Sequence, residues 1–157
     1  MRANEIQAAD YLNIGKLVVF PTETVFGLGA SIEFPNSCSQ IFQHKKRPLE
    51  DPLIIHLNLS VHSISDYAVI PSHTWFQKIF EKYSPGPLTY VLPKTKNVPF
   101  IVSGGLETVA VRIPNHFQAQ QMLSKVRRPV AAPSANLFGK TSPTKYEHLP
   151  KFENVLI

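Results

Sequence analysis

An apolar run that passes directly into a polar, glycine-containing segment is the strongest constraint in this sequence. The run Leu17 to Val19 leads into residues 20–30, which read FPTETVFGLGA. The apolar residues are typical of a buried strand, and Pro21 ends that strand because proline cannot donate the amide hydrogen that a sheet needs. Hydroxyl and carboxyl groups therefore follow where the strand leaves the core. In α/β proteins this is a usual place for a ligand.

Helix and strand patterns alternate along the first half of the chain, and strand patterns cluster in the middle. Capping residues such as Asn4 and Asn36, and stop signals such as Gly15 and Pro48, mark the predicted helices. Helices are predicted at residues 4–15, 37–45, 60–69, 72–83 and 114–126, and strands at 16–20, 53–57, 88–93, 100–105, 108–114 and 129–136. The pattern favours an α/β fold with a twisted, mixed parallel and antiparallel sheet and flanking helices.

Length and composition favour one ordinary soluble domain. A chain of 157 residues has the usual size of a single domain, and no window approaches the roughly 18 consecutive apolar residues of a membrane helix. We therefore expect one domain over residues 1–157 and no membrane partner. The polar N-terminus and the single cysteine, Cys38, favour a cytoplasmic location, and Cys38 is expected to fill the core. The net charge of +5 favours an anionic partner, either a nucleic acid or a phosphorylated ligand.

Polar residues at several predicted strand ends would converge if those ends share one rim of the sheet. They are Thr22 and Thr24 after the first strand, His56 and Arg112 near the ends of two others, and Ser134 to Asn136 after the last. The cationic cluster Lys45 to Arg47 lies at a predicted helix end, where cations can simply compensate the helix dipole at the surface. Combined with the hydroxyl groups, however, Lys45, Arg47 and Arg112 would suit a polyphosphate.

Familiar nucleotide, nucleophile and metal motifs are absent from the sequence. There is no GxxxxGK[ST] loop, and GLG after PTETVF lacks the spacing of a dinucleotide fingerprint. No GxSxG elbow surrounds Ser134, which argues against a serine hydrolase. The six histidines and Cys38 show no metal-ligand spacing, so no protein-bound metal is predicted. Any metal is expected to be Mg²⁺ brought by phosphate oxygens.

Five ordered segments resemble the YrdC/TsaC family of threonylcarbamoyl-AMP synthases. They are FPTETVFGLGA, KKRP with PLIIHL downstream, SPGPLTYVLP, TVAVRIP and APSANLFGKTSPT, and the resemblance covers residues 15–144. It implies a YrdC-like domain with a concave basic face. It also implies an enzyme that joins L-threonine, bicarbonate and ATP into threonylcarbamoyl-AMP and releases pyrophosphate. The product would serve threonylcarbamoyladenosine modification of tRNA, which implies tRNA or a downstream transferase complex as a partner.

The resemblance also assigns roles to residues. It places threonine near Thr22, Thr24, His56 and Arg112, and ATP near Lys45, Arg47, Asp51, Thr108, Ser134, Asn136 and Ser142, with Lys45 and Arg47 as the catalytic pair. The planar fork of an arginine suits a carboxylate. No protein nucleophile is implied, because the carbamate formed from threonine would attack the α-phosphorus.

Structural alternatives remain open for several of these residues. His56 could be a hydrogen-bonded core histidine, and Arg112 could face solvent on a half-buried strand. Thr108 could be a strand former only, and Glu23 could cap a helix instead of touching magnesium. Gly27 and Gly29 could serve close packing or ligand approach.

Two features depart from the family pattern. Asp51 stands where asparagine is common, and its carboxylate would weaken nucleotide binding unless a cation or a hydrogen bond intervenes. Family members also usually continue past SPT into a further strand and a serine-containing stretch, so we expect a shortened member or a fragment. Two other functions stay open: a noncatalytic module for tRNA or double-stranded RNA, whose affinity would fall with salt, and a carbamoyl-transfer domain separated from a larger enzyme.

Overall fold

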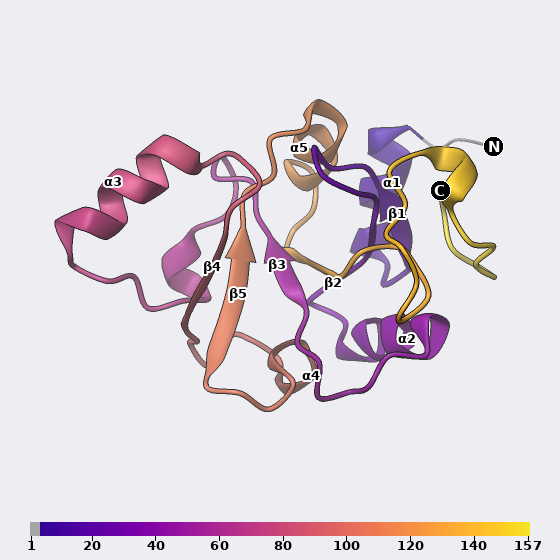
Figure 1. The fold of residues 1–157 in the computed structure, drawn as a ribbon, viewed down its shortest axis with the longest axis horizontal. Helices are drawn as coiled ribbons and strands as arrows, with labels where there is room; N and C mark the ends of the chain where they lie inside the picture. Colours follow the sequence, from indigo (N-terminus) through magenta and orange to yellow (C-terminus); the bar gives the residue numbers. More distant parts are fainter. Residues whose placement is uncertain (1–3) are drawn as a thin grey trace.

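The computed structural model describes residues 4–157, so the first three residues of the predicted domain lie outside the described part. Its centre is a six-stranded sheet of order β1-β2-β6-β3-β5-β4 (Figure 1). Among the six strands described within residues 4–157, β3 and β5 are the one parallel pair and the other pairs are antiparallel, so the predicted mixed sheet is confirmed. The strands are β1 (Val18–Phe20), β2 (Gly27–Ser31), β3 (Ile54–His56), β4 (Thr89–Pro93), β5 (Thr108–Arg112) and β6 (Val130–Ala132).

Five α-helices flank this sheet, as the α/β prediction requires. They are α1 (Glu5–Asn13), α2 (Pro35–Lys45), α3 (Thr74–Tyr83), α4 (Phe100–Ser103) and α5 (Phe117–Leu123), with 3₁₀ turns η1 (Ile64–Asp66) and η2 (Tyr146–His148). The capping box predicted for α1 is present, because the Asn4 side chain accepts from the Gln7 amide and the Gln7 side chain accepts from the Asn4 amide. No helix within residues 4–157 is long and apolar enough to cross a membrane.

The two faces of the sheet are covered to different extents. One face packs against α2, α3 and α4 through a large core that includes Leu28, Ile55 and Val111. The opposite face packs against α1 and α5 beside β1 and β6, through a smaller cluster that includes Phe20 and Val130. His56 pairs with Val130 in register and therefore points to this second face. Beyond the smaller cluster this face is more open, and Val91 on edge strand β4 is 67% exposed.

Several sequence predictions of local structure are wrong for identifiable reasons. Residues 60–69 form only a 3₁₀ turn, because the Asn58 side chain accepts the Ser60 amide and competes with helical bonding. Residues 100–105 form helix α4 instead of a strand, with Pro99 before it and Gly104 in a left-handed conformation after it. Helix α2 starts at Pro35, and Asn36 does not cap it.

Trp75, Phe76, Ile79 and Phe80 recur at helical spacing, which predicts that this stripe of α3 packs in the core, and the prediction is only partly correct. Phe76 is buried against Tyr90, whereas Trp75 is 56% exposed. On α5, Phe117 is exposed at the first turn. Helical spacing located both helices correctly. Which of their residues are buried depends on how much of each helix packs against the sheet.

Strand β2 passes so close to its neighbours that Gly29 has no room for a side chain. A Cβ atom there would lie 2.6 Å from Cγ1 of Val130 and 2.8 Å from the Phe20 ring. We expect Gly29→Ala to lower the free energy of unfolding by about 1 to 3 kcal/mol, the usual cost of overpacking. Urea unfolding measures this loss, and adding Val130→Ala should recover part of it. Unchanged stability in Gly29→Ala would show that the sheet relaxes freely at this point.

Candidate functional site

A cavity of about 280 Å³ opens on the more exposed side of the sheet, beside β3, β5 and the turn before β2. Five residues predicted to bind ligands line it, namely Thr22, Arg47, His56, Arg112 and Ser134. They come from five segments that are distant in sequence, so the expected convergence at one site is confirmed for these residues. The remaining lining residues are Val25, Gly27, Pro52, Ile54, Ala132 and Pro133.

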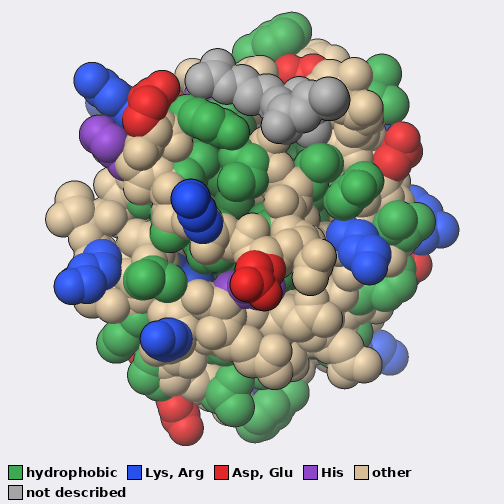
Figure 2. All heavy atoms as spheres, turned by 90° about the vertical axis from the view of Figure 1, so that its right-hand side faces the viewer, with side chains coloured by type: hydrophobic (Ala, Val, Ile, Leu, Met, Phe, Trp, Pro, Cys, Tyr) green, Lys and Arg blue, Asp and Glu red, His purple; other side chains and the backbone are tan. Residues whose placement is uncertain are grey.

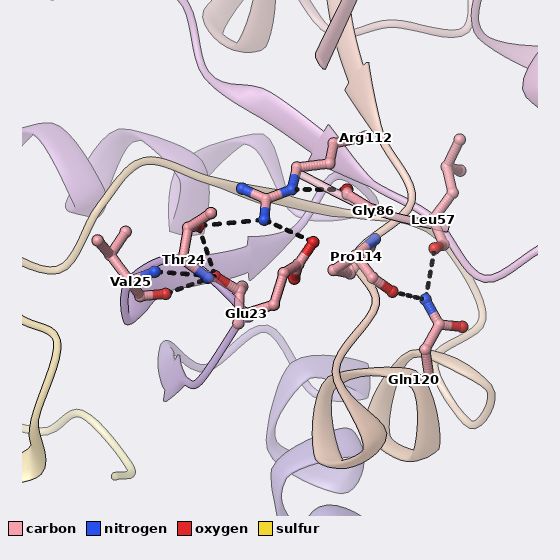
Figure 3. A network of polar contacts seen from close by, with 9 residues as sticks. Glu23, Thr24, Val25, Leu57, Gly86, Arg112, Pro114 and Gln120 are labelled. Atoms are coloured by element: carbon pink, nitrogen blue, oxygen red, sulfur yellow. Dashed lines mark hydrogen bonds and ion pairs between the residues drawn. The ribbon is translucent and has the colours of Figure 1, made fainter. Parts of the chain in front are cut away.

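Arg112 at the end of β5 is held by three partners from two other segments (Figure 3). Its Nη2 atom lies 2.9 Å from Glu23 Oε1 and donates to Thr24 Oγ1 at 3.1 Å. Its Nε atom donates to the Gly86 carbonyl oxygen at 3.4 Å. The residue is 7% exposed, so the alternative that Arg112 faces solvent is wrong. Within residues 4–157, its third nitrogen, Nη1, has no hydrogen-bond or ion-pair partner and can receive a ligand.

Glu23, for which the sequence left open a helix cap or a magnesium contact, pairs with Arg112 instead. Burial favours a raised pKa for its carboxyl group, but the hydrogen bond and charge of Arg112, with backbone hydrogen bonds at Glu23 and Asn115, outweigh this and lower the pKa. The carboxylate is therefore the counter-ion of Arg112 and does not cap a helix. Its adjacency to two threonines in PTET gave no sign of a partner on β5.

The turn from Pro21 to Phe26 is organised by the Thr22 hydroxyl group. Its Oγ1 atom donates to the Val25 carbonyl oxygen at 2.6 Å, and the Val25 amide donates back to it at 3.2 Å. Thr24 Oγ1 lies 3.0 Å from Thr22 Oγ1. Figure 3 shows how this turn brings Glu23 and Thr24 to the Arg112 guanidinium. The PTET segment is thus a structured turn that places one wall of the cavity.

His56 is a buried, hydrogen-bonded histidine that also lines the cavity. It is 4% exposed, its Nδ1 atom lies 3.0 Å from the Ile54 carbonyl oxygen, and its ring packs edge-on against Phe20. Burial, followed by the nearby Arg112 charge, lowers its pKa to about 4. The imidazole is therefore neutral at pH 7, and it presents a polar but uncharged edge to a ligand.

The fold is expected to lose stability between pH 7 and pH 5 in part because of His56. The pKa is about 4 in the folded chain and 6.5 ordinarily, so between these values only the unfolded state binds the proton. The free energy of unfolding should fall by roughly 2 kcal/mol at pH 5 through this group. Urea unfolding at both pH values tests this, and His56→Asn should reduce the loss. An equal loss in the variant and the wild type would contradict it.

Arg47 follows helix α2 and projects a half-buried guanidinium into the cavity. Its Nη2 atom donates to the Pro52 carbonyl oxygen at 3.2 Å, which fixes the side chain across the turn. Its Nε atom lies 3.8 Å from Asp51 Oδ2. Asp51 is partly exposed and does not line the cavity, so its extra negative charge is offset by a cation, which is the condition under which an anionic ligand can still bind.

The segment after β6 is held together by the Asn136 side chain. Its Oδ1 atom accepts from the hydroxyl groups of Ser134 at 2.5 Å and Ser142 at 3.2 Å. Its Nδ2 atom donates to the carbonyl oxygens of Leu137 and Lys140. Ser134 lines the cavity, whereas Asn136 and Ser142 are not among the lining residues. The predicted cluster Ser134, Asn136 and Ser142 is therefore brought together as one hydrogen-bonded unit.

Two predicted ligand residues occupy other positions. Lys45 is 1% exposed, does not line the cavity, and donates from its ammonium group to the backbone carbonyl oxygens of Ser134 and Asn136. The alternative that Lys45 is a solvated surface cation is therefore wrong. Thr108 begins β5, pairs with Pro93 and lies outside the cavity lining. It has the same side-chain direction as Arg112, four residues further along the strand, because alternate strand residues share a face.

Neither Cys38 nor the larger cavity of the structure offers a second site for the predicted ligand residues. Cys38 is fully buried, and burial raises the pKa of its thiol to about 12, so its predicted role as core filler is confirmed. A larger cavity of about 420 Å³ lies among α1, β1 and residues 144–147, and it contains none of the predicted ligand residues. Among residues 4–157 there is no group of three His, Cys, Asp or Glu side chains that could hold a metal ion.

Lys and Arg side chains are dispersed on one large face of the molecule. Figure 2 shows them standing singly around apolar and neutral areas, with no continuous basic patch on the face that is turned to the viewer. Two cations, Arg47 and Arg112, instead line the cavity together with Thr22 and Ser134. A concave basic face stays a prediction.

An α/β fold with a mixed sheet, and with two arginines and a neutral histidine in one cavity, defines a domain that can bind a small anionic ligand. A family model named for Sua5, YciO and YrdC, and described as telomere recombination, matches residues 10–156. The chain therefore belongs to the Sua5/YciO/YrdC family, which confirms the resemblance seen in its motifs.

Curated relatives of this family share the sequence over most of the chain. The chain is 47% identical over 143 residues to the threonylcarbamoyl-AMP synthase of Pyrococcus abyssi, covering 90% of this chain and 41% of that protein. It is 32% identical to the threonylcarbamoyl-AMP synthase of Hydrogenovibrio crunogenus, covering 89% of this chain and 76% of that protein. The chain thus spans about two fifths of the length of the first of these relatives.

Solved structures confirm the fold. The crystal structure of P. abyssi Sua5 complexed with L-threonine matches with a TM-score of 0.82 and 42% identity, covering 94% of this chain and 44% of that one. Escherichia coli YciO matches with a TM-score of 0.74 and 25% identity, covering 87% of this chain and 65% of that one.

Proposed function

We propose that this chain is the synthase domain of a threonylcarbamoyl-AMP synthase. It would join L-threonine, bicarbonate and ATP into threonylcarbamoyl-AMP and release pyrophosphate. The observation that supports this most is the single cavity in which Arg47, His56 and Arg112 meet, in a chain closely similar to enzymes of that name. The domain would supply this product to the threonylcarbamoyladenosine modification of tRNA, which makes tRNA or its transferase complex a downstream partner.

Threonine would occupy the Arg112 side of the cavity. The free Nη1 atom of Arg112 would donate to the substrate carboxylate, while Nη2 keeps its bonds to Glu23 and Thr24. The neutral His56 edge and the Thr22 and Thr24 hydroxyl groups would contact the amino and side-chain groups. The substrate complex of the P. abyssi relative supports threonine as the ligand class.

ATP would occupy the Arg47 side of the cavity. Its phosphates would meet the Arg47 guanidinium and the Ser134 hydroxyl group, with Mg²⁺ bound by the phosphate oxygens. Asn136, Ser142 and Thr108 stay predicted nucleotide residues, and Asp51 would act through Arg47. ATP as a whole is larger than the cavity of about 280 Å³, so its outer phosphates and its adenosine would extend toward solvent.

The reaction needs positioning and charge stabilisation. The amine of threonine attacks the carbon of bicarbonate, and water leaves to give the carbamate. A carbamate oxygen then forms a bond to the α-phosphorus, and the bond from that phosphorus to the β-phosphate oxygen breaks to release pyrophosphate. Arg47 would offset the charge that develops on the phosphates, and the cavity would hold both substrates in line.

The proposal is tested by measuring pyrophosphate with purified protein, MgATP, bicarbonate and L-threonine. We expect release with all components and none when threonine or bicarbonate is omitted. L-Serine, which lacks the methyl group, serves as a matched substrate control. Release that does not depend on threonine would contradict the proposal. Absence of release together with tight, salt-sensitive RNA binding would favour the noncatalytic module instead.

A further inference from the structure

The two cations at the end of α2 have different partners. Arg47 lines the cavity, whereas Lys45, two residues earlier, is 1% exposed and is not among the residues that line the cavity. We infer that Lys45 is a positioning residue that fixes the cavity wall at residues 134–138 and does not itself contact the nucleotide. The consequence for ATP binding rests on the proposed function, but the positioning itself does not.

Lys45 holds residues 134–138 through its side chain and its backbone together. The Nζ atom donates to the Ser134 carbonyl oxygen at 2.5 Å and to the Asn136 carbonyl oxygen. The Lys45 carbonyl oxygen accepts from the Phe138 amide at 2.9 Å. One residue of α2 therefore satisfies three backbone groups over five residues of a segment that is about ninety positions away in sequence.

This arrangement leaves the Lys45 ammonium little capacity for a phosphate. An ammonium group has three donor hydrogens, and two are directed at carbonyl oxygens inside the protein. Reaching the cavity would require breaking these bonds and exposing two buried carbonyl oxygens without partners, which is costly. Burial, with the adjacent Arg47 charge, lowers the Lys45 pKa to about 8, so the group still carries its proton at pH 7.

The segment that Lys45 holds contributes directly to the cavity. Ser134 lines the cavity, and the Ala135 amide donates to the Phe26 carbonyl oxygen at 2.7 Å, which ties the segment to the turn before β2. From its other end, the Asn136 side chain closes the loop on Leu137 and Lys140. Release of Lys45 would therefore displace the Ser134 wall without removing any charge from the cavity.

The test compares Lys45→Met with Lys46→Met, a neighbour that is exposed and has the same charge. Hydrogen exchange of ligand-free protein, followed by mass spectrometry, reports on peptides that cover residues 134–142. We expect faster exchange there in Lys45→Met only, with α1 and α5 unchanged. Calorimetry with MgATP, without threonine or bicarbonate, should show affinity about tenfold weaker, the size expected for loss of a charge-assisted hydrogen bond. The salt dependence of that affinity should match the wild type.

A direct contact with phosphate predicts a different result. Lys45→Met would then keep wild-type exchange at residues 134–142 and show weaker salt dependence of MgATP binding, as expected for Arg47→Met. Either result overturns the inference. If Lys45→Met does not fold, Asn136→Ala replaces it as the test. This variant removes the side-chain hydrogen bonds within residues 134–142 and leaves Lys45 intact. It should also speed exchange at residues 134–142 of the ligand-free protein, and wild-type exchange in it would contradict the inference.

The exchange measurement separates this inference from the proposed function. If the wild type releases no pyrophosphate and binds no MgATP, the proposed function fails. Faster exchange at residues 134–142 in Lys45→Met would still support the positioning role. If the wild type is active and exchange is unchanged in Lys45→Met, the proposed function stands and the positioning role fails.

Discussion

Arg47→Ala is expected to abolish detectable pyrophosphate release while the chain stays folded. Arg47 is the cation on the side of the cavity where we propose that ATP binds, and Asp51 next to it would be left without its partner. Loss of two charge-assisted hydrogen bonds at about 1.5 to 3 kcal/mol each corresponds to a fall of at least 100-fold in kcat/KM. Pyrophosphate assays over a range of MgATP concentrations measure it.

The control for Arg47→Ala is Lys46→Ala, which removes an exposed cation one residue earlier. It should keep activity within about threefold of the wild type, because an exposed charge contributes little through solvent. Far-ultraviolet circular dichroism and urea unfolding check that both variants are folded. Arg47 also donates to the carbonyl oxygens of Asp51 and Pro52. Loss of helical signal in Arg47→Ala would show that Arg47 is structural and that its placement as a phosphate ligand is wrong.

Arg112→Met is expected to weaken threonine binding strongly and also to lower stability. Methionine keeps much of the length and apolar character of the side chain but cannot donate to a carboxylate. The affinity for L-threonine should fall by about 10- to 100-fold, because the charge-assisted hydrogen bond from Nη1 to the substrate carboxylate would be lost. The free energy of unfolding should fall by roughly 2 to 4 kcal/mol, since Glu23 and Thr24 lose a partly buried partner. Calorimetry and urea unfolding measure the two effects.

Glu23→Gln is the matched control for Arg112→Met, because both variants break the same ion pair. The glutamine has the same shape, and Arg112 stays available for the substrate carboxylate. We expect Glu23→Gln to bind L-threonine at least as tightly as the wild type. Equal loss of threonine binding in the two variants would mean that the arrangement of the PTET turn, and not the Arg112 guanidinium, decides recognition.

The sequence predicted the architecture where the local signals agree with tertiary packing. The capping residue Asn4 marked the start of α1, and β-branched runs located β1, β3 and β5. Strand β2 was not predicted, because glycine usually disfavours strands. Gly29 is tolerated there since Val130 and Phe20 approach too closely for any side chain, and such a contact between distant segments has no local signature.

The sequence also predicted which chemical groups the cavity would contain, but not how they are partnered. Thr22, Arg47, His56, Arg112 and Ser134 were predicted, and they line the cavity together. Glu23 was not predicted as the counter-ion of Arg112, because the two residues are far apart in sequence and no spacing rule links them. Lys45 and Arg47 looked equivalent as a cationic motif. In the structure they differ, because Lys45 is buried and donates to backbone carbonyl oxygens whereas Arg47 lines the cavity.

Threonylcarbamoyl-AMP formation from ¹³C-bicarbonate tests the central claim most directly. The protein would be incubated with MgATP, L-threonine and ¹³C-bicarbonate, and the products would be separated and weighed by mass spectrometry. We predict an adenylate that contains threonine and one ¹³C atom, and that is absent when L-threonine or the protein is left out. A wild-type protein that binds ATP and threonine yet forms no labelled adenylate, or an adenylate without the label, would contradict the account.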